Sequence, residues 1–295
     1  MDNRNQGSNT RGHLIAIVMA LIIGVIGTLY GLNHPRPAPI SGDGLTVHYI
    51  DGGQGDSALV TCDGETMLID GGGKSAGGTV TEYLQAQGVQ SLDVLVATHP
   101  HLDHCGGLDT VVVNVPVKTI YSPVTESDNA AFTEFADAVV TAGATITVPE
   151  ANSTFPLGGA TVTVLGPLGD YERFDNVNNQ SIVLRIDYGE TSFLFPGDAE
   201  YEEETLLLDA GANVRCDVLK AGHHGSNSST GYRLLYEAEP TYCIISCGAN
   251  NEYGHPHEDT LSRLRDAGVT VYRTDESGTI VCTSDGVNLT FTTEK

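Results

Sequence analysis

The segment ATHPHLDHCGG, residues 97–107, gathers four potential metal ligands over six positions: His99, His101, Asp103 and His104. Imidazole and carboxylate groups suit zinc, manganese or iron, and they need no thiolate beside them. A solvated histidine-rich loop is the alternative interpretation. It is disfavoured because the segment follows an apolar run directly and is closed by Gly106 and Gly107, which permit a tight turn. The pattern therefore predicts a metal site at the end of a buried strand.

Two later apolar runs end in further ligands, at Asp198 in FLFPGDAE and at His223 and His224 in DVLKAGHHGS. One loop cannot complete the shells of two metal ions, so ligands from other strand ends are expected on the same rim. Taken singly, a Gly-Asp turn is common and a His-His pair can lie on any surface. The three segments together predict a two-metal centre.

Short β-type runs separated by glycines, alternating with helix-type runs, must position these residues. Strands are predicted at residues 45–51, 57–64, 66–73, 92–99, 117–123, 144–150, 160–167, 181–189, 191–198, 216–226, 240–248, 270–274, 278–286 and 288–294. Helices are predicted at residues 78–89, 129–144, 201–211, 229–239 and 257–268. This interleaving, without a linker between the halves, predicts one α/β domain of mixed sheets with helices packed outside.

The sequence carries a formal net charge of -24 and only 14 lysines and arginines. Non-specific affinity for nucleic acid comes mainly from cations that neutralise phosphates, so tight sequence-independent DNA binding is disfavoured. Bound divalent cations would offset part of the charge where a phosphate has to lie. The basic residues considered for a cluster near the cleft are Arg173, Arg185, Lys220 and Arg233.

Six cysteines without any CxxC pair disfavour a zinc ribbon. They are Cys62, Cys105, Cys216, Cys243, Cys247 and Cys282. Most are expected to be buried small side chains, and one or two disulfides stay open as an alternative.

Residues 14–32 form a run of nineteen uncharged, mainly apolar positions. At a rise of about 1.5 Å per residue, this run nearly crosses a hydrocarbon core of about 30 Å. We predict a transmembrane anchor there, with residues 1–13 as a short cytoplasmic tail because arginines precede the run. Residues 33–43 would form a Pro-rich tether and residues 44–295 an extracytoplasmic domain at the cell membrane. A cleaved signal segment, which would make the protein secreted, stays open.

The motifs HxHxDH, a strand-end Gly-Asp and HHGS, in this order, resemble those of the metallo-β-lactamase superfamily. More narrowly, five segments resemble the extracytoplasmic hydrolase domain of ComEC-type DNA-uptake proteins and its stand-alone relatives: residues 51–72, 98–107, 178–200, 219–229 and 250–257. The resemblance spans about residues 45–293. It implies a four-layer αβ/βα sandwich with the metal ions at one edge between two sheets, preceded here by the predicted transmembrane helix.

The resemblance also implies how the ligands divide between two divalent metal ions, zinc or alternatively manganese. The ligands would be His99 and His101 for one ion, Asp103, His104 and His224 for the other, and Asp198 as the bridge. His223 would contact a phosphoryl oxygen, although exchange of the roles of His223 and His224 stays open.

Further residues would hold the ligating imidazoles or contact substrate: Asp56, Asp70, Asn179, Glu200 and His255. Turn chemistry is the alternative for Asp56 and Asp70, and a solvated helix start is the alternative for Glu200. Many members of the superfamily have a histidine in the stretch around Asn179, where this chain has only NNQ. The first metal site is therefore expected to be more open.

In the expected mechanism, two cations about 3.5–4 Å apart lower the pKa of a bridging water, and the metal-activated hydroxide is the nucleophile. Asp103 would orient that water and accept its proton, and His223 would donate to the leaving group. We therefore expect a metal-dependent hydrolase.

The expected activity is that of a phosphodiesterase or nuclease outside the membrane, linked to DNA uptake. Its substrate would be single-stranded DNA or nucleotides, and no stable protein partner is expected. A small phosphoester hydrolase such as a phosphorylcholine esterase is the alternative enzyme, since an acidic protein does not repel choline. A non-catalytic surface module that binds metal is the third possibility, because the missing histidine can indicate a vestigial metal site that has lost its catalytic role. β-Lactamase activity is disfavoured because GQGDS and HHGS are not motifs of antibiotic-degrading enzymes.

Overall fold

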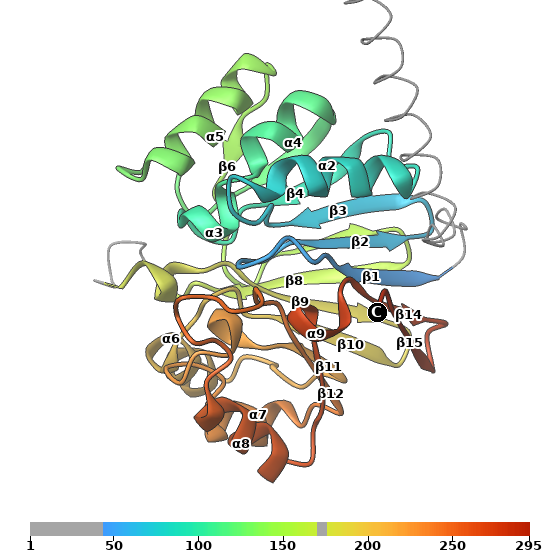
Figure 1. Ribbon diagram of the computed structural model, residues 1–295, viewed down its shortest axis with the longest axis vertical. Coiled ribbons are helices and arrows are strands. Elements are labelled where there is room, and N and C mark those ends of the chain that lie inside the picture. Colours follow the sequence, from blue (N-terminus) through green and yellow to red (C-terminus); the bar gives the residue numbers. More distant parts are fainter. Residues whose placement is uncertain (1–43, 170–175) are drawn as a thin grey trace, which may run out of the picture. The chain divides into compact units, whose positions relative to one another are not determined.

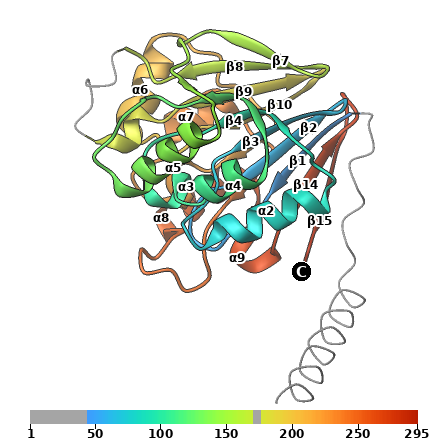
Figure 2. The same cartoon turned by 90° about the horizontal axis from the view of Figure 1, so that it is seen from above.

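The computed structural model describes residues 44–169 and 176–295 (Figure 1). The predicted tail, transmembrane segment and tether, residues 1–43, lie outside the described residues, as does Arg173. Within the two described ranges, no helix is both long and apolar enough to cross a membrane. Two β-sheets that pack face to face, with helices on their outer faces, make up this part of the chain (Figures 1 and 2).

The first sheet has eight strands in the order β15-β14-β1-β2-β3-β4-β5-β6. In chain order they are β1 (Leu45–Tyr49), β2 (Ala58–Cys62), β3 (Glu65–Ile69), β4 (Leu92–Val96), β5 (Val117–Tyr121), β6 (Ile146–Thr147), β14 (Ile280–Ser284) and β15 (Leu289–Thr293). Neighbours from β15 to β3 are antiparallel, and neighbours from β3 to β6 are parallel. The sheet therefore joins a set of antiparallel strands to β-α-β crossovers, as the sequence pattern predicts.

The second sheet has seven strands in the order β13-β12-β11-β10-β9-β8-β7. In chain order they are β7 (Thr154–Leu157), β8 (Ala160–Gly166), β9 (Val183–Tyr188), β10 (Thr191–Phe195), β11 (Val218–Lys220), β12 (Tyr242–Ile245) and β13 (Thr270–Arg273). Neighbours from β7 to β10 are antiparallel, and neighbours from β10 to β13 are parallel. This second half repeats the mixed design of the first.

Helices cover the outer face of each sheet (Figure 1). The first sheet is covered by α2 (Ala76–Ala86), α4 (Leu108–Asn114) and α5 (Ala130–Thr141). The second sheet is covered by α6 (Tyr201–Asp209), α7 (Tyr232–Ala238) and α8 (Glu258–Asp266). The shorter helical turns are α3 (Leu102–Cys105), η2 (Val177–Gln180), η3 (Gly222–Gly225) and α9 (Thr274–Ser277).

Three apolar layers hold the sandwich together, because successive strand residues point to opposite faces of a sheet. In β2, Val60 lies in the core between the sheets and Leu59 in the core under the helices. In β10, Phe193 lies between the sheets and Leu194 packs toward the helices of the second half. Strands buried on both faces read as continuous apolar runs, which explains the unbroken apolar stretches of the sequence. The predicted four-layer αβ/βα sandwich is confirmed.

Helix α4 lies where the sequence pattern predicts no element. Its sequence, LDTVVVN, contains three consecutive valines, a residue type that favours strands. Leu108, Val111 and Val112 recur at helical spacing and are buried in the core shared with α2 and α5. Packing against these two helices therefore overrides local propensity.

The parallel strands of both sheets bring the predicted ligands to one edge. The carboxyl ends of neighbouring parallel strands lie on the same side of a sheet. His99 follows β4, Asp198 follows β10, and His224 follows β11. Loops far apart in the sequence therefore meet at this edge.

Candidate metal centre

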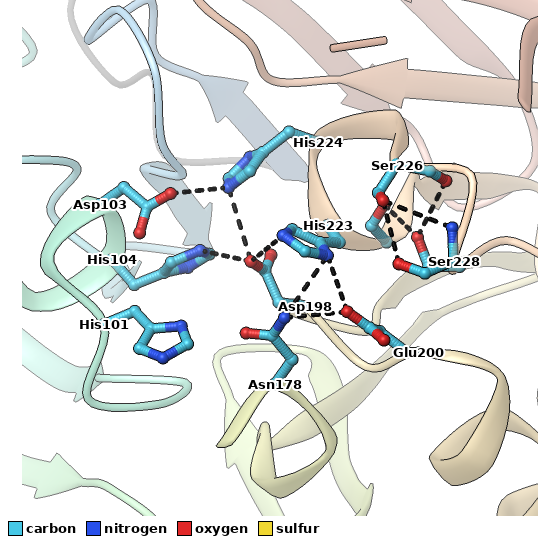
Figure 3. Close-up of polar contacts among 12 residues, drawn as sticks. His101, Asp103, His104, Asn178, Asp198, Glu200, His223, His224, Ser226 and Ser228 are labelled. Carbon is cyan, nitrogen blue, oxygen red and sulfur yellow. Dashed lines mark hydrogen bonds and ion pairs between the residues drawn. The ribbon is translucent and has the colours of Figure 1, made fainter. Parts of the chain in front are cut away.

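Imidazoles and carboxylates from several loops converge on the carboxylate of Asp198 (Figure 3). Its Oδ2 lies 3.2 Å from Nε2 of His104 and 3.6 Å from Nε2 of His224. The same oxygen lies 3.9 Å from Nε2 of His99. All four side chains are almost fully buried.

The other two predicted ligands, Asp103 and His101, complete the group. Oδ2 of Asp103 lies 3.2 Å from Nε2 of His224, and Nδ1 of His101 lies 3.0 Å from Nε2 of His99. The structure thus brings together all six side chains predicted as metal ligands. The rings of His99 and His104 lie side by side near Asp198, with centroids 4.2 Å apart.

Asp70, which directly follows β3, binds His104 on the side of the ring opposite Asp198. Its Oδ2 accepts a hydrogen bond from Nδ1 of His104 at 2.8 Å and one from the hydroxyl of Thr98 at 2.7 Å. Its Oδ1 accepts a hydrogen bond from the backbone N–H of Thr98, also at 2.7 Å. Because this hydrogen bond keeps a proton on Nδ1 of His104, Nε2 is the nitrogen that faces Asp198 and can give a lone pair to a metal ion.

Asp56 lies near the centre because Gly55 allows its loop to contact the backbone of Asp103. The backbone N–H of Asp56 donates to the carbonyl of Asp103 at 3.1 Å. Gly55 has a φ of +128°, and a Cβ there would lie 2.2 Å from the same carbonyl oxygen. Oδ1 of Asp56 lies 3.1 Å from Nδ1 of His224, and its Oδ2 forms an ion pair with the buried Lys220. Asp56 therefore supports His224 from the side that faces away from Asp198.

The His-His pair occupies a strained turn in which both residues have positive φ, 46° and 53°. His224 is buried, and its Nδ1 donates to the carbonyl of Ser246 at 3.0 Å, so that Nε2 faces Asp198. The His223 side chain keeps 24% of its surface exposed; its Nδ1 lies 3.1 Å from Oε1 of Glu200 and its Nε2 3.7 Å from Asp198. His224 thus offers a ligand atom, and His223 offers a nitrogen that solvent can reach.

Glu200 and Asn178 lie beside His223 (Figure 3). Asn178 donates from Nδ2 to Oε1 of Glu200 at 2.9 Å and lines the pocket. Asn179 turns away, because its Oδ1 accepts the backbone N–H of Glu200 at 2.8 Å and its Nδ2 donates to Glu202 at 3.3 Å. The residue of this stretch that faces the pocket is therefore Asn178, where the sequence pointed to Asn179. Glu200 orients His223 instead of standing free at the start of α6.

Opposite charges shift the pKa values in the cluster. Burial would raise the pKa of Asp198, but His104 and His224 hold it well below its usual value. Burial would lower the pKa of His224, but Asp198 and Asp56 raise it to about 9. For His99, burial and the neighbouring His104 lower the pKa well below its usual value, so this ring is neutral at pH 7. The raised pKa of His224 indicates a negative potential at that ring, which favours a bound cation.

The donor set fits divalent metal ions. Among the described residues, Nε2 of His104, Oδ1 of Asp198 and Nε2 of His224 are buried at the centre without a hydrogen-bond partner, as is Oδ1 of Asp56 beside these three residues. Ligand atoms of these three residues and of Asp56 lie within 4.8 Å of one another. Asp56 faces Nδ1 of His224, whereas Asp103 faces Nε2, so Asp103 lies on the side where an ion would bind. This cluster of aspartates and histidines can bind a dinuclear metal site.

A pocket of about 340 Å³ opens over the cluster. Its outer part is lined by Gln54, Leu102, Asn129, Asn178, Tyr253 and His255. The ring of His255 lies 5.3 Å from that of His223, and burial followed by repulsion from His224 and His223 lowers the pKa of His255 to about 4. His255 therefore lies at the pocket as a neutral imidazole.

Of the basic residues considered for a cleft, the three that the structure describes do not line the pocket. Arg185 pairs with Asp187 at 2.5 Å, and Arg233 pairs with Asp209 at 2.7 Å. Lys220 is buried under the cluster, and no lysine or arginine of the described ranges lines the pocket. The six cysteines, all within the described ranges, are buried and free.

Sequence reasoning missed two supporting residues and the position of Tyr253. Ser181 accepts the backbone N–H of Asp198 at 3.1 Å and lies 3.3 Å from Nδ1 of His99, but nothing in its local sequence indicates this. Lys220 lies in a buried ion pair and not in the cleft that the sequence suggests, and a lysine inside an apolar strand is a recognisable signal for such a pair. Tyr253 lies two residues before His255 in the sequence. The sequence pattern indicated His255 as a residue near the substrate but gave no sign that Tyr253 lies there too.

Residues 50–248 match the family described as Metallo-beta-lactamase superfamily. The chain is 32% identical over 252 residues to ComE operon protein 3 of Bacillus subtilis (strain 168), covering 79% of this chain and 32% of that protein. It is 33% identical over 254 residues to Competence protein ComA of Neisseria gonorrhoeae. This match covers 85% of this chain and 34% of that protein. The chain therefore spans about a third of the length of these curated relatives.

A solved structure shares the fold. It is that of the metallo-beta-lactamase fold protein YhfI from Bacillus subtilis, with a TM-score of 0.56 at 12% identity. The match covers 82% of this chain and 100% of that protein. At this level of identity the likeness concerns the fold alone.

Proposed function

We propose that this chain, which belongs to the metallo-beta-lactamase superfamily, is a metal-dependent hydrolase that cleaves phosphodiester bonds. The observation that carries the proposal is the convergence of three imidazole nitrogens on Oδ2 of Asp198 in a buried, negatively charged site. An exposed pocket over this site gives a substrate access to it.

Six side chains would hold the metal ions: His99 and His101 one ion, Asp103, His104 and His224 the other, and Asp198 both. Divalent ions held there would activate a water molecule and stabilise negative charge on the attacking and leaving oxygens. An imidazole-rich set favours zinc, and the carboxylates also suit manganese.

His223 is placed to move a proton. Its Nδ1 is held by Oε1 of Glu200 at 3.1 Å, which leaves Nε2 facing the pocket near Asp198. A proton on that Nε2 can pass to a leaving oxygen or bind a phosphoryl oxygen. Asp103 also lines the pocket, where its carboxylate can orient a water molecule and accept its proton. Asp70 and Asp56 fix the neighbouring imidazoles in advance, so little reorganisation is required during reaction.

Nucleic acid is the proposed phosphodiester. Support comes from the similarity to ComE operon protein 3 and to Competence protein ComA. With an anchor at residues 14–32, the domain would act outside the membrane on an incoming single strand during DNA uptake. Because no lysine or arginine of the described residues lines the pocket, the bound metal ions would have to neutralise the phosphate.

The test is a metal and turnover assay on the 295-residue chain, purified in detergent. Bound metals are measured, and hydrolysis of bis-p-nitrophenyl phosphate, p-nitrophenylphosphorylcholine and labelled single-stranded DNA is followed with zinc or manganese. We expect metal-dependent turnover of the diester and of DNA. Asp103→Ala and His104→Ala should abolish it, while Asp137→Ala, which removes an exposed carboxylate of α5, should not.

The substrate profile decides between the enzymatic alternatives. Turnover confined to the phosphorylcholine ester would replace the nuclease by a small phosphoester hydrolase. Folded protein that binds metal and turns over none of the three substrates would point to a binding module instead.

A further inference from the structure

An aromatic side chain stands exposed at the rim of the pocket over the metal centre. Tyr253 is 57% exposed and lines the pocket together with Gln54 and His255. Its ring stacks on the imidazole of His255, with ring centroids 5.7 Å apart and an interplanar angle of 23°. This is the offset stacked geometry that aromatic pairs prefer, and it leaves much of the phenol ring open to a further flat group.

The stack is fixed to the metal centre by hydrogen bonds and ring contacts. Oδ1 of Asn251 accepts the backbone N–H of His255 at 2.9 Å, and Nδ2 of Asn251 donates to the carbonyl of Gly248 at 2.9 Å. The ring of His255 in turn lies 5.3 Å from that of His223. Two ring contacts therefore connect the exposed phenol to the imidazole beside Asp198, and a preformed platform costs little ordering entropy on binding.

Positively charged side chains cannot account for binding of the organic part of a substrate in this pocket. No lysine or arginine of the described ranges lines it, and the whole sequence carries a net charge of -24. Stacking of a base on an aromatic ring does not depend on cations, and every base has a π-face. An exposed tyrosine is therefore the kind of contact that an acidic protein can use for nucleic acid.

Two unsatisfied polar atoms in the pocket wall complement this flat surface. Oε1 of Gln54 accepts the backbone N–H of Gly248 at 3.0 Å, while its Nε2 is buried without a partner among the described residues. Oδ1 of Asn178, another residue that lines the pocket, is also buried without a hydrogen-bond partner among the described residues. Two residues of the pocket lining thus each carry one buried polar atom without a partner, a donor in Gln54 and an acceptor in Asn178.

We infer that Tyr253, stacked on His255, forms a subsite for a base of a single-stranded nucleic acid whose phosphate lies at the metal centre. The inference rests on the proposed phosphodiesterase function and names the part of the substrate that the pocket rim holds. It makes Tyr253 a residue that determines substrate preference, since it lies at the rim and outside the ligand set.

A binding experiment tests the subsite without requiring turnover. The fluorescence anisotropy of a labelled thymidine hexanucleotide and of an abasic strand with the same number of phosphates is measured with the full 295-residue chain and its metal. We expect tighter binding of the strand with bases. Tyr253→Ala should remove roughly five- to hundredfold of that preference, the range typical of one stacked base, and Tyr253→Phe should keep it. Tyr236→Ala, which removes an exposed tyrosine of α7, is the matched control.

A kinetic comparison gives the second readout. Thymidine 5′-(p-nitrophenyl phosphate) and methyl p-nitrophenyl phosphate share the leaving group and the charge but differ by the nucleoside. Tyr253→Ala should lower kcat/KM for the thymidine ester, mainly through KM, and leave the methyl ester unchanged.

Equal binding of the two strands, or an equal loss for both esters in Tyr253→Ala, would overturn the subsite. A loss confined to p-nitrophenylphosphorylcholine would overturn it in favour of a cation-binding ring. Base-dependent binding that Tyr253→Ala abolishes, without hydrolysis of either ester by the wild type, would uphold the subsite and count against the proposed hydrolysis alone.

Discussion

Oδ2 of Asp70 lies 2.8 Å from Nδ1 of His104, and this contact decides which nitrogen of the imidazole can face Asp198. A carboxylate can only accept a hydrogen bond, so it keeps the proton on Nδ1 and the lone pair on Nε2. Such partners of ligating histidines fix the ring and its tautomer.

Asp70→Asn should therefore weaken metal binding while leaving the fold intact. The amide oxygen can still accept the backbone N–H of Thr98, but the amide nitrogen then faces Nδ1 of His104. His104 must move its proton to Nε2, and we expect a loss of about 10- to 100-fold in metal affinity. Competition with a chromophoric chelator measures the affinity. An unchanged affinity in a folded variant would show that Asp70 does not orient His104.

The two adjacent histidines of η3 should respond differently to substitution. His224→Ala removes a buried nitrogen that faces Asp103 and Asp198, so bound metal should be lost together with activity. His223→Ala removes a partly exposed ring held by Glu200, so metal content should stay while kcat falls by about 10²- to 10⁴-fold. Metal analysis and steady-state kinetics on the same preparations separate the two. If His223→Ala lost the metal and His224→Ala kept it, the roles would be exchanged.

Gly55→Ala should destabilise the domain, because the new Cβ would lie 2.2 Å from the carbonyl oxygen of Asp103 and the residue has a φ of +128°. We expect a loss of about 2–4 kcal/mol in the free energy of unfolding, measured with urea. Gly53→Ala is the matched control, since Gly53 also has a positive φ but nothing lies within 4 Å of its Cβ position. It should cost only about 1 kcal/mol. Equal losses in both variants would mean that backbone strain alone, and not the contact between the loops, sets the requirement for glycine.

His48 should make the fold sensitive to acid. Burial lowers the pKa of His48 to about 4 from 6.5, and its Nδ1 lies 2.8 Å from the hydroxyl of Tyr83. Between these two pKa values the unfolded chain binds more protons than the folded chain, so the free energy of unfolding falls as the pH falls. His48→Gln cannot take up this proton. Between pH 7 and pH 5 the wild type should therefore lose about 2 kcal/mol more than the variant. Urea unfolding in EDTA, which removes any contribution from metal release, measures the difference, and parallel curves for the two proteins would refute the assignment.

The sequence by itself determined the order of most strands and of the longer helices, but not β7 or α4, and it determined the set of residues that meet at Asp198. Both depend on local patterns: apolar runs form strands, ligand types follow them, and parallel strands bring their carboxyl ends to one edge. The HxHxDH segment, Asp198 and the His-His pair could be recognised for this reason. The helix α4 could not, because its valines favour strands and only packing against α2 and α5 makes it helical.

Only the tertiary structure decided which of two neighbouring side chains faces the centre. The turn at η3 buries His224 and leaves His223 partly exposed. The side chain of Asn179 bonds the backbone of Glu200 and points away from the pocket, whereas Asn178 lines it. The pairing of Lys220 with Asp56 and the position of Tyr253 at the rim were decided in the same way. The physical reason is that each depends on contacts between loops that are distant in the sequence, and local residue patterns carry no information about such contacts.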